Sequence, residues 1–156
     1  MILVDVNVLV AAFRPDSALH GPLRSWLSEA LRGREPVGLP DAVLVSVVRL
    51  TTSARIFHVP SALEEALAFV AATRQAPRAM RVVEGERFFE LFREQCLATG
   101  ATGRGIPDAA LASLAIENGA ILATLDGGFG RFPRLTWMDP LDGAVRKNPA
   151  RSASQP

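Results

Sequence analysis

Three aspartates occupy positions from which their carboxylates could act together. Asp5 follows a short apolar run at the start of the chain, Asp126 follows the apolar run 120–125, and Asp108 opens an alanine-rich segment. A carboxylate beside a buried strand loses hydration energy unless another group compensates its charge. Carboxylates about 4 Å apart also repel by roughly 4 kcal/mol at an effective dielectric near 20, so a cluster of them implies a raised pKa or a bound ion.

The chemistry of such a cluster indicates which ion it would bind. Carboxylate oxygens without histidine or cysteine ligands suit magnesium or manganese better than zinc. Such an ion can activate a water molecule and neutralise the negative charge that develops on a phosphodiester. The three aspartates are therefore candidates for a Mg²⁺ or Mn²⁺ site that acts on a phosphate ester.

Each aspartate also has an ordinary structural interpretation. Asp108 could cap a helix after a proline-containing loop, and Asp126 could be a turn residue before Gly127 and Gly128. Asp5 is harder to explain in this way, because of the desolvation cost at a buried strand. The chemical interpretation thus depends on the three carboxylates sharing one site.

The rest of the chain predicts elements that would bring these residues together. Short apolar runs predict strands, and apolar residues at helical spacing predict helices. The predicted strands cover 1–6, 36–39, 79–83, 120–125 and 135–138, and the predicted helices cover 20–32, 42–50, 62–73, 86–99 and 108–118. This alternation predicts an α/β fold with a parallel sheet covered on both faces. Ligands bind beyond the carboxyl ends of parallel strands, so Asp5 and Asp126 are expected in one crevice.

Local signals sharpen several of these boundaries. Asp41 is expected to cap the second helix, and Ser61 stands three residues before Glu64, in the spacing of a capping box. The segment 101–107 is rich in glycine and ends in proline, so it predicts a loop that leads directly into Asp108.

The bulk composition sets the class of protein. A chain of 156 residues with 49% hydrophobic residues predicts one domain over 1–142, followed by a tail over 143–156 that we expect to be flexible. No apolar run suits a membrane helix or a signal peptide, so we expect a cytoplasmic protein without a membrane partner. The single cysteine, Cys96, is expected to be buried filler. A net charge of +1 lacks the basic excess of many nucleic-acid binders and decides nothing.

Other enzyme classes find little support. The two histidines, His20 and His58, lie outside any recognisable nucleophile motif. Residues 103–105 (GRG) lack the lysine of a Walker phosphate loop. Residues 5–9 (DVNVL) weakly resemble aspartyl-phosphate phosphatases, but Asn7 stands where their second acid would be, and the only lysine lies in the predicted tail.

Three motifs resemble those of a known family. Residues 4–9 (VDVNVL) resemble the opening of PIN domains, and residues 106–112 (IPDAALA), followed by 117–120 (ENGA), resemble their third acidic motif. Residues 123–129 (ATLDGGF) match the Thr-x-Asp-x-x-Phe ending. In this order and at this spacing, the motifs resemble those of bacterial VapC toxins of toxin–antitoxin systems.

The resemblance extends over most of 1–141, because residues 130–141 and 48–52 also resemble segments of actinobacterial VapC proteins. It implies a PIN-like three-layer α/β/α fold with a central, mainly parallel sheet. It further implies a magnesium-dependent endoribonuclease toxin that cleaves structured RNA such as tRNA or rRNA and inhibits translation. A VapB-like antitoxin would neutralise such a toxin, and homodimers are common in the family.

The resemblance also implies roles for individual residues. Asp5, Asp108 and Asp126 are the expected catalytic residues and the expected metal ligands, either directly or through water. Asn7 and Thr124 are expected to orient these carboxylates or the attacking water.

The chain departs from the family pattern at two positions. PIN domains usually carry a glutamate on the second helix, where the best match is Ser46, with Asp41 as the next candidate. Many family members also carry an acid two residues after the last aspartate, where this chain has Gly128. Three acids can still hold one magnesium ion, which commonly keeps several of its own waters. The pattern argues against a second ion.

Two alternatives stay open. Because acids are missing at Ser46 and Gly128, the sequence is also compatible with a catalytically weak PIN fold that acts only by binding RNA or an antitoxin. A phosphatase of the aspartyl-phosphate type is the more distant alternative. Arg49 and Arg104 could contact RNA phosphates or the antitoxin, although arginines are more often solvated or ion-paired.

Overall fold

Six strands form one sheet through the middle of the molecule. They are β1 (Ile2–Val4), β2 (Val37–Pro40), β3 (Ala79–Val82), β4 (Ile121–Ala123), β5 (Thr136–Met138) and β6 (Val145–Lys147). The computed structural model describes residues 1–150. The strand order is β3-β2-β1-β4-β5-β6, with parallel pairing except between β5 and β6. The sheet is therefore mainly parallel, as predicted.

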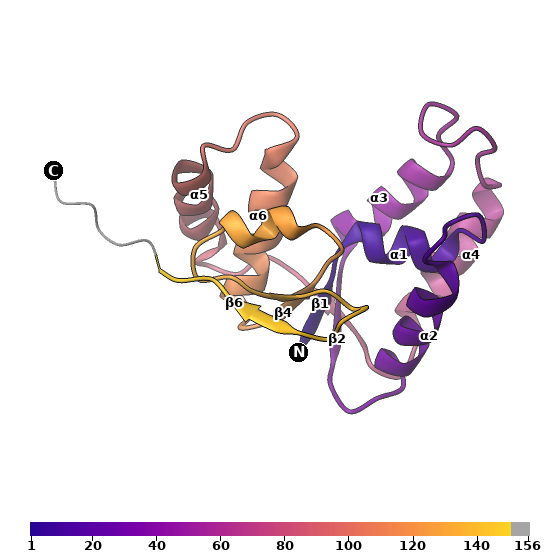
Figure 1. Cartoon of the computed structure of the whole chain (residues 1–156), viewed down its shortest axis with the longest axis horizontal. Coiled ribbons are helices and arrows are strands. Elements are labelled where there is room, and N and C mark those ends of the chain that lie inside the picture. The colour runs from indigo at the N-terminus through magenta and orange to yellow at the C-terminus, as the bar shows by residue number, and fades with distance from the viewer. Residues whose placement is uncertain (151–156) are drawn as a thin grey trace, which may run out of the picture.

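Helices cover both faces of this sheet. They are α1 (Val6–Phe13), α2 (His20–Ala30), α3 (Asp41–Thr51), α4 (Leu63–Arg74), α5 (Phe88–Thr99), α6 (Gly105–Glu117) and the short 3-10 helix η1 (Gly127–Arg131). One buried cluster joins β1 and β2 to α1, α2 and α3, and another joins β4 and β5 to α6 and η1, with α5 packed against it. Figure 1 shows α5 and α6 on one side of the sheet and α1 to α4 on the other. This is the predicted three-layer α/β/α fold.

Helix α1 was not expected from the sequence, which predicts a first strand extending to Val6. The β-branched residues of the segment VNVLVAAF favour a strand by propensity. Asp5 ends the strand because it takes the N-cap position of α1, where its carboxylate accepts a hydrogen bond from the Val6 amide. The helix then buries Val8, Leu9, Ala11 and Ala12. Packing therefore overrides local propensity in this segment.

The predicted capping interactions of α3 and α4 are wrong, although both helices are present. Asp41 lies in the first turn of α3 and makes no cap, because its carboxylate pairs with two arginines. Ala62 is the N-cap of α4, and the Ser61 hydroxyl accepts a hydrogen bond from Arg14 at 2.9 Å. Both polar side chains thus contact cations, which form stronger hydrogen bonds than neutral amide donors.

Helix α6 begins earlier than predicted, which changes the setting of Asp108. The predicted loop over 101–107 ends at Arg104, and Gly105 is the first residue of the helix. Pro107 is tolerated inside the helix because amides of the first turn have no intrahelical partner. Asp108 therefore lies in the first turn and is not a cap, at the end where the helix dipole favours negative charge.

The sheet continues beyond the predicted domain boundary at residue 142. Strand β6 lies within the predicted tail 143–156 and pairs with β5. The Asn148 side chain accepts a hydrogen bond from the Trp137 indole at 3.1 Å and donates to the Phe129 and Phe132 carbonyls. The predicted boundary is therefore too early, and residues 151–156 of the predicted tail lie outside the described residues.

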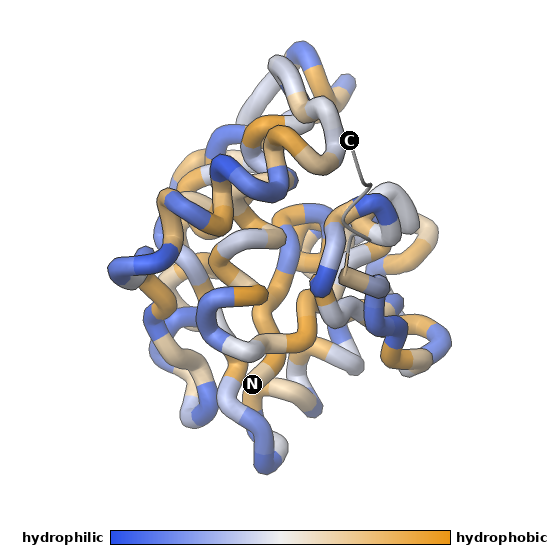
Figure 2. Tube along the Cα trace, turned by 90° about the vertical axis from the view of Figure 1, so that its left-hand side faces the viewer, coloured by the Kyte–Doolittle hydropathy of each residue, from blue (hydrophilic) through white to orange (hydrophobic). Residues whose placement is uncertain are grey.

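The core lies between the sheet and its helices. Many of the hydrophobic segments, orange in Figure 2, run through the middle of the molecule, and many of the hydrophilic ones, in blue, lie along its outline. Cys96, expected to be buried, is only partly buried against the α5 and α6 side of the core. Within residues 1–150, the structure contains no helix with the length and apolar character needed to cross a membrane.

Candidate metal centre

Asp5 lies where the strand order changes direction. Strand β1 pairs with β2 on one side and with β4 on the other, so β1 and β4 end side by side. The Asp5 amide continues this pairing by donating to the Ala123 carbonyl at 3.0 Å. Ligands bind at such switch points, beyond the carboxyl ends of the strands. Asp5 follows β1 and residues 124–126 follow β4, so the predicted residues lie at one edge.

Thr124 is the centre of a hydrogen-bond network at this edge. Its hydroxyl donates to Asp5 Oδ2 at 2.6 Å and accepts from the Asn7 side-chain nitrogen at 3.1 Å. It also accepts from the Asp126 backbone amide at 3.1 Å, and Asn7 in turn accepts from the Leu125 amide at 3.2 Å. A hydroxyl that accepts two hydrogen bonds has its single proton directed at the remaining partner, here Asp5. We call Asp5, Asn7 and Thr124 the floor of the site.

The carboxylate of Asp5 is strongly desolvated, since the residue is 5% exposed. Burial raises the pKa of Asp5, and the charges of Asp108 and Asp126 raise it further. Hydrogen bonds from Thr124 and the Val6 amide lower the pKa but do not cancel these effects. Across residues 1–150, the ion pairs of the structure do not include Asp5. A bound cation would stabilise the charged form of this carboxylate.

Asp126 is exposed and is the N-cap residue of η1. Its Oδ1 accepts a hydrogen bond from the Gly128 amide at 2.7 Å, so the turn interaction expected for this residue is present. A Cβ atom on Gly128 would lie 2.8 Å from that same oxygen. An acid at position 128, as in many members of the family that the chain resembles, would therefore force the Asp126 carboxylate to move.

Asp108 is half-buried and pairs with an arginine that the sequence analysis did not single out. Arg131, at the end of η1, places its Nη2 atom 3.0 Å from Asp108 Oδ2. Burial raises the pKa of Asp108, the charge and hydrogen bond of Arg131 lower it, and the charge of Asp126 raises it, with a net increase. The only sequence signal for Arg131 is its position five residues after Asp126, in the segment 130–141 that resembles actinobacterial VapC proteins.

Asp5 and Asp108 line one cavity of ≈ 390 Å³. Asp41 and Ser46 of α3 and Glu84, just after β3, line it as well. Ser46 is half-buried. Ser46 lies on α3, the helix that the sequence analysis counted as the second, and it does reach the cavity. It brings a hydroxyl to the cavity where the family usually has a carboxylate. We call the half-exposed carboxylates of Asp41 and Asp108, with the arginines that pair with them, the rim of the site.

The three predicted carboxylates influence one another without converging on one point. The charges of Asp108 and Asp126 both act on Asp5, although Asp126 does not line the cavity. In the part of the chain that the structure describes, no three His, Cys, Asp or Glu side chains are grouped as a ready metal cluster. Magnesium keeps several waters and is often held by only one or two carboxylates, so a hydrated ion fits this all-oxygen set.

Two other arginines predicted to contact phosphate or a partner lie elsewhere. Arg49 and Arg104 are exposed and do not line the cavity. Arg81 of β3 does line it, and its guanidinium contacts Asp41 at 2.9 Å. Sequence analysis missed Arg81 because no local motif surrounds it.

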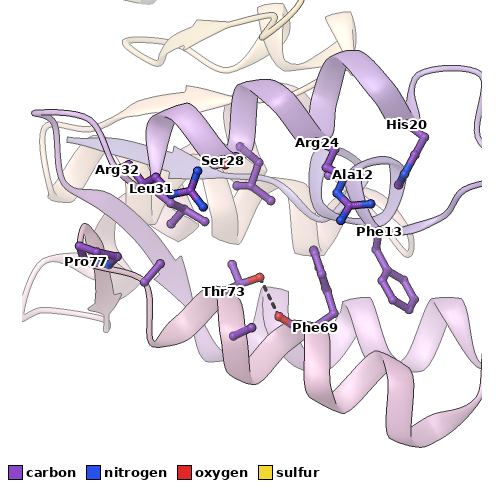
Figure 3. Close-up of a pocket in the computed structure, with 13 residues that line it drawn as sticks. Ala12, Phe13, His20, Arg24, Ser28, Leu31, Arg32, Phe69, Thr73 and Pro77 are labelled. Atoms are coloured by element: carbon purple, nitrogen blue, oxygen red, sulfur yellow. Dashed lines mark hydrogen bonds between the residues drawn. The ribbon is translucent and has the colours of Figure 1, made fainter.

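A larger cavity of ≈ 610 Å³ lies between α2 and α4 and shares no lining residue with the cavity of Asp5 (Figure 3). Its lining is mostly apolar and includes Phe13 and Phe69, with Arg24 and Arg32 on the α2 side. Neither Asp nor Glu is among its lining residues in the described part of the chain. It therefore suits an apolar ligand and not a divalent cation.

Comparison with known proteins bears on the family of the chain. A family model of the PIN domain matches residues 2–135. Ribonuclease VapC43 of Mycobacterium tuberculosis is 44% identical over 143 residues, which cover 92% of this chain and 97% of that protein.

Solved structures support the same fold. VapBC2 from Rickettsia felis, bound to a DNA fragment from its promoter, has a TM-score of 0.65 at 17% identity, covering 88% of this chain and 98% of that one. VapC20 of Mycobacterium tuberculosis, described as a sarcin-ricin loop cleaving toxin, has a TM-score of 0.60 at 20% identity, with coverages of 83% and 92%.

Proposed function

This chain belongs to the PIN-domain family of VapC ribonucleases, and on that premise we propose that it is a magnesium-dependent endoribonuclease, the toxin of a toxin–antitoxin pair. The observation that carries the proposal is the Asp5 carboxylate, which is buried at an acidic cavity with no ion-pair partner within residues 1–150. A divalent ion would supply the missing positive charge. Manganese suits the same oxygen ligands.

The residues of the site would divide the work between holding the ion and orienting its ligands. Asp5 and Asp108 would hold it in the cavity that both line, and Asp126 would act directly or through water. When bound, the ion would activate a water molecule and neutralise charge on the scissile phosphate. Thr124 directs its proton at Asp5, and Asn7 fixes the Thr124 hydroxyl. Such supporting bonds hold a ligand in place before the ion arrives.

Structured RNA is the proposed substrate, with inhibition of translation in the cytoplasm as the result. Two comparisons support this choice. VapC43 is named a ribonuclease, and VapC20, which shares the fold, is described as cleaving the sarcin-ricin loop. Both tRNA and rRNA therefore belong in the first substrate screen.

An antitoxin is the proposed protein partner. The VapBC2 neighbour was solved with DNA from its own promoter, as expected for a toxin whose partner binds DNA. The apolar cavity between α2 and α4 suits the hydrophobic side chains of an inhibitory segment (Figure 3). Arg24 and Arg32 would attract acidic residues of that segment.

A cleavage assay tests the nuclease. Purified protein should cleave a pool of tRNA and rRNA with magnesium present, stop when EDTA is added, and resume when magnesium is restored in excess. Equal cleavage in the chelator would contradict the metal mechanism. Failure to cut any RNA with magnesium or manganese would contradict the nuclease itself.

A growth assay tests the toxin. Expression of the chain should slow growth in a host that contains its natural RNAs. Co-expression with the product of a neighbouring short gene should restore growth, and the two proteins should purify together. Normal growth on expression of the toxin alone would contradict this part of the proposal.

A second function, RNA or antitoxin binding without cleavage, is favoured by one observation. Ser46 brings a hydroxyl to the cavity where the family usually has a carboxylate, which weakens the attraction for a cation. A chain of this kind would bind RNA in EDTA with the same affinity as in magnesium and leave the RNA intact in both.

A further inference from the structure

One wall of the acidic cavity carries a cationic group that the proposed metal chemistry does not use. Arg81 of β3 is the only basic residue lining the cavity in the described part of the chain. Its Nε and Nη2 atoms each contact Asp41 Oδ2 at 2.9 Å. Arg74, the last residue of α4, bonds the other carboxylate oxygen of Asp41. We call Arg74 and Arg81 the arginine pair.

The arginine pair keeps a positive charge at the edge of the cavity. Two guanidinium groups share the single carboxylate of Asp41, which leaves a net charge of about +1 on this trio. Partial desolvation raises the pKa of Asp41, but the hydrogen bonds and charges of both arginines outweigh it and lower the pKa. Asp41 therefore stays ionised at neutral pH, and arginine keeps its charge in proteins.

The arginine pair also has donors free for a ligand. Each guanidinium carries five N–H groups, and the bonds to Asp41 engage only a few of them. The Arg74 and Arg81 side chains are 47% and 60% exposed. A solvent-facing fork of this kind matches the geometry of phosphate oxygens.

Stability alone does not explain this convergence. Exposed ion pairs contribute little to folding stability, and one arginine would already neutralise Asp41. The three residues come from three separate elements: Asp41 directly follows β2, Arg81 lies next to the last residue of β3, and Arg74 reaches Asp41 from the end of α4. Asp41 and Arg81 line the same cavity as Asp5 and Asp108, and Arg74 reaches this wall through its bond to Asp41. A cationic group and the metal-binding groups therefore face one space.

We propose that Arg74 and Arg81 bind a backbone phosphate of the RNA strand that flanks the phosphate being cleaved, with Asp41 as the positioning residue that holds both guanidinium groups. This inference rests on the proposed ribonuclease function. The acidic floor would hold the scissile phosphate through a cation, and the arginine pair would hold its neighbour directly. The strand would thus be fixed at two points across the cavity.

RNA binding in EDTA tests the proposal without any turnover. A fluorescent single-stranded RNA of mixed sequence is titrated with the full chain over a range of salt concentrations. Arg81→Gln and Arg74→Gln should each weaken binding by about fivefold, the cost of removing one exposed charged group. Each should also make the plot of log affinity against log salt shallower by about 0.7, because each variant neutralises one RNA phosphate fewer.

Arg78→Gln is the matched control. Arg78 is an exposed arginine at the start of the same β-strand region, and its Nε donates to the Gly33 carbonyl, outside the cavity. The substitution removes the same charge as Arg81→Gln. Because Arg78 lies outside the cavity, the binding curve and salt slope of this variant should stay close to those of the unmodified chain. Arg81→Lys keeps the charge and should recover part of the affinity, because lysine lacks the bidentate fork.

The outcomes separate this inference from the proposed function. Equal losses in the Arg78 and Arg81 variants would overturn it, since the arginines would then act only through overall charge. Unchanged RNA binding in the Arg74 and Arg81 variants would overturn it too, including the case in which only antitoxin binding weakens. An unmodified chain that neither binds nor cleaves RNA would instead contradict the proposed function. If Arg81→Gln unfolds by circular dichroism, Arg74→Gln and Arg81→Lys decide the result.

Discussion

The negative charges of the carboxylates on the floor and on the rim of the acidic cavity are compensated in different ways. On the floor, Asp5 is buried, and its hydrogen-bond partners are the Thr124 hydroxyl and the Val6 amide, which are neutral. On the rim, the Asp108 and Asp41 side chains are 35% and 42% exposed, and each pairs with arginine. A carboxylate is therefore stabilised by neutral hydrogen-bond donors on the floor and by charged arginines on the rim.

This difference determines which carboxylates can exchange their present partner for a metal ion or a phosphate. Exposed ion pairs contribute little to stability, so a rim arginine can leave its carboxylate for a metal or a phosphate at small cost. The floor offers Asp5 no such counter-charge, and its burial stays unfavourable until a cation binds. Substitutions on the floor should therefore lower the activity strongly, whereas removal of a rim arginine should only adjust it.

Removing the charge of Asp5 should have the largest effect. Asp5→Asn keeps the shape of the side chain, and cleavage should fall by on the order of 10²-fold or more, beyond the roughly 10–100-fold typical of a supporting group. Asp142→Asn is the control, because Asp142 forms an exposed ion pair with Arg146. Initial rates on one RNA measure both variants. Unchanged cleavage in Asp5→Asn would show that Asp5 is structural.

Removing the Thr124 hydroxyl should have the next largest effect. Thr124→Val keeps the shape but takes away the donor to Asp5 and the acceptor for Asn7. Cleavage should fall by roughly 10–100-fold, as for other residues that orient a metal ligand. Thr124→Ser retains the hydroxyl and should keep most of the rate. If the valine and serine variants lose activity equally, the methyl packing matters and the hydroxyl does not.

Adding a carboxylate at position 46 should strengthen the ion site. Ser46 lines the same cavity as Asp5 and Asp108, so Ser46→Glu should bind magnesium about tenfold more tightly. A tenfold change in affinity corresponds to about 1.4 kcal/mol. This free energy is well below the attraction of roughly 4 kcal/mol between unit charges 4 Å apart at an effective dielectric of 20, because the cavity is open to solvent. Calorimetric titration gives the affinity. A drop in thermal stability without tighter binding would show that the new carboxylate points into the core.

Removing the cation beside Asp108 should have the smallest effect. Arg131→Gln leaves Asp108 without its ion-pair partner, so magnesium affinity should rise by about two- to fivefold, in line with an exposed pair. The same titration measures it. Weaker magnesium binding would mean that Arg131 organises Asp108 for the metal and does not compete with it.

The sequence allows the floor to be predicted well. Asp5 and Thr124 each follow a short apolar run, and apolar runs predict strands whose carboxyl ends share one edge. The hydrogen bonds of Asn7 to Thr124 and Leu125 agree with the supporting position expected for this residue. Both segments lie within motifs whose residues are close together in the chain, so local pattern is sufficient.

The ion pairs of the rim could not be predicted, because their partners are distant in sequence. Asp41 stands 33 residues before Arg74 and 40 before Arg81, and no pattern of spacing connects them. The sequence instead suggested a helix cap for Asp41, which is the common local role. Strand β6 was missed for a related reason: its three residues bury little, and it depends on pairing with β5.

The central claim is that the cation binds beside Asp5. Titration with Mn²⁺ followed by electron paramagnetic resonance gives the bound ion as the difference between total and free Mn²⁺ and requires no turnover. The unmodified chain should bind one ion with saturation, Asp142→Asn should bind it equally well, and Asp5→Asn should bind at least about tenfold more weakly. Mn²⁺ binding by Asp5→Asn with the stoichiometry and affinity of the unmodified chain would contradict this claim.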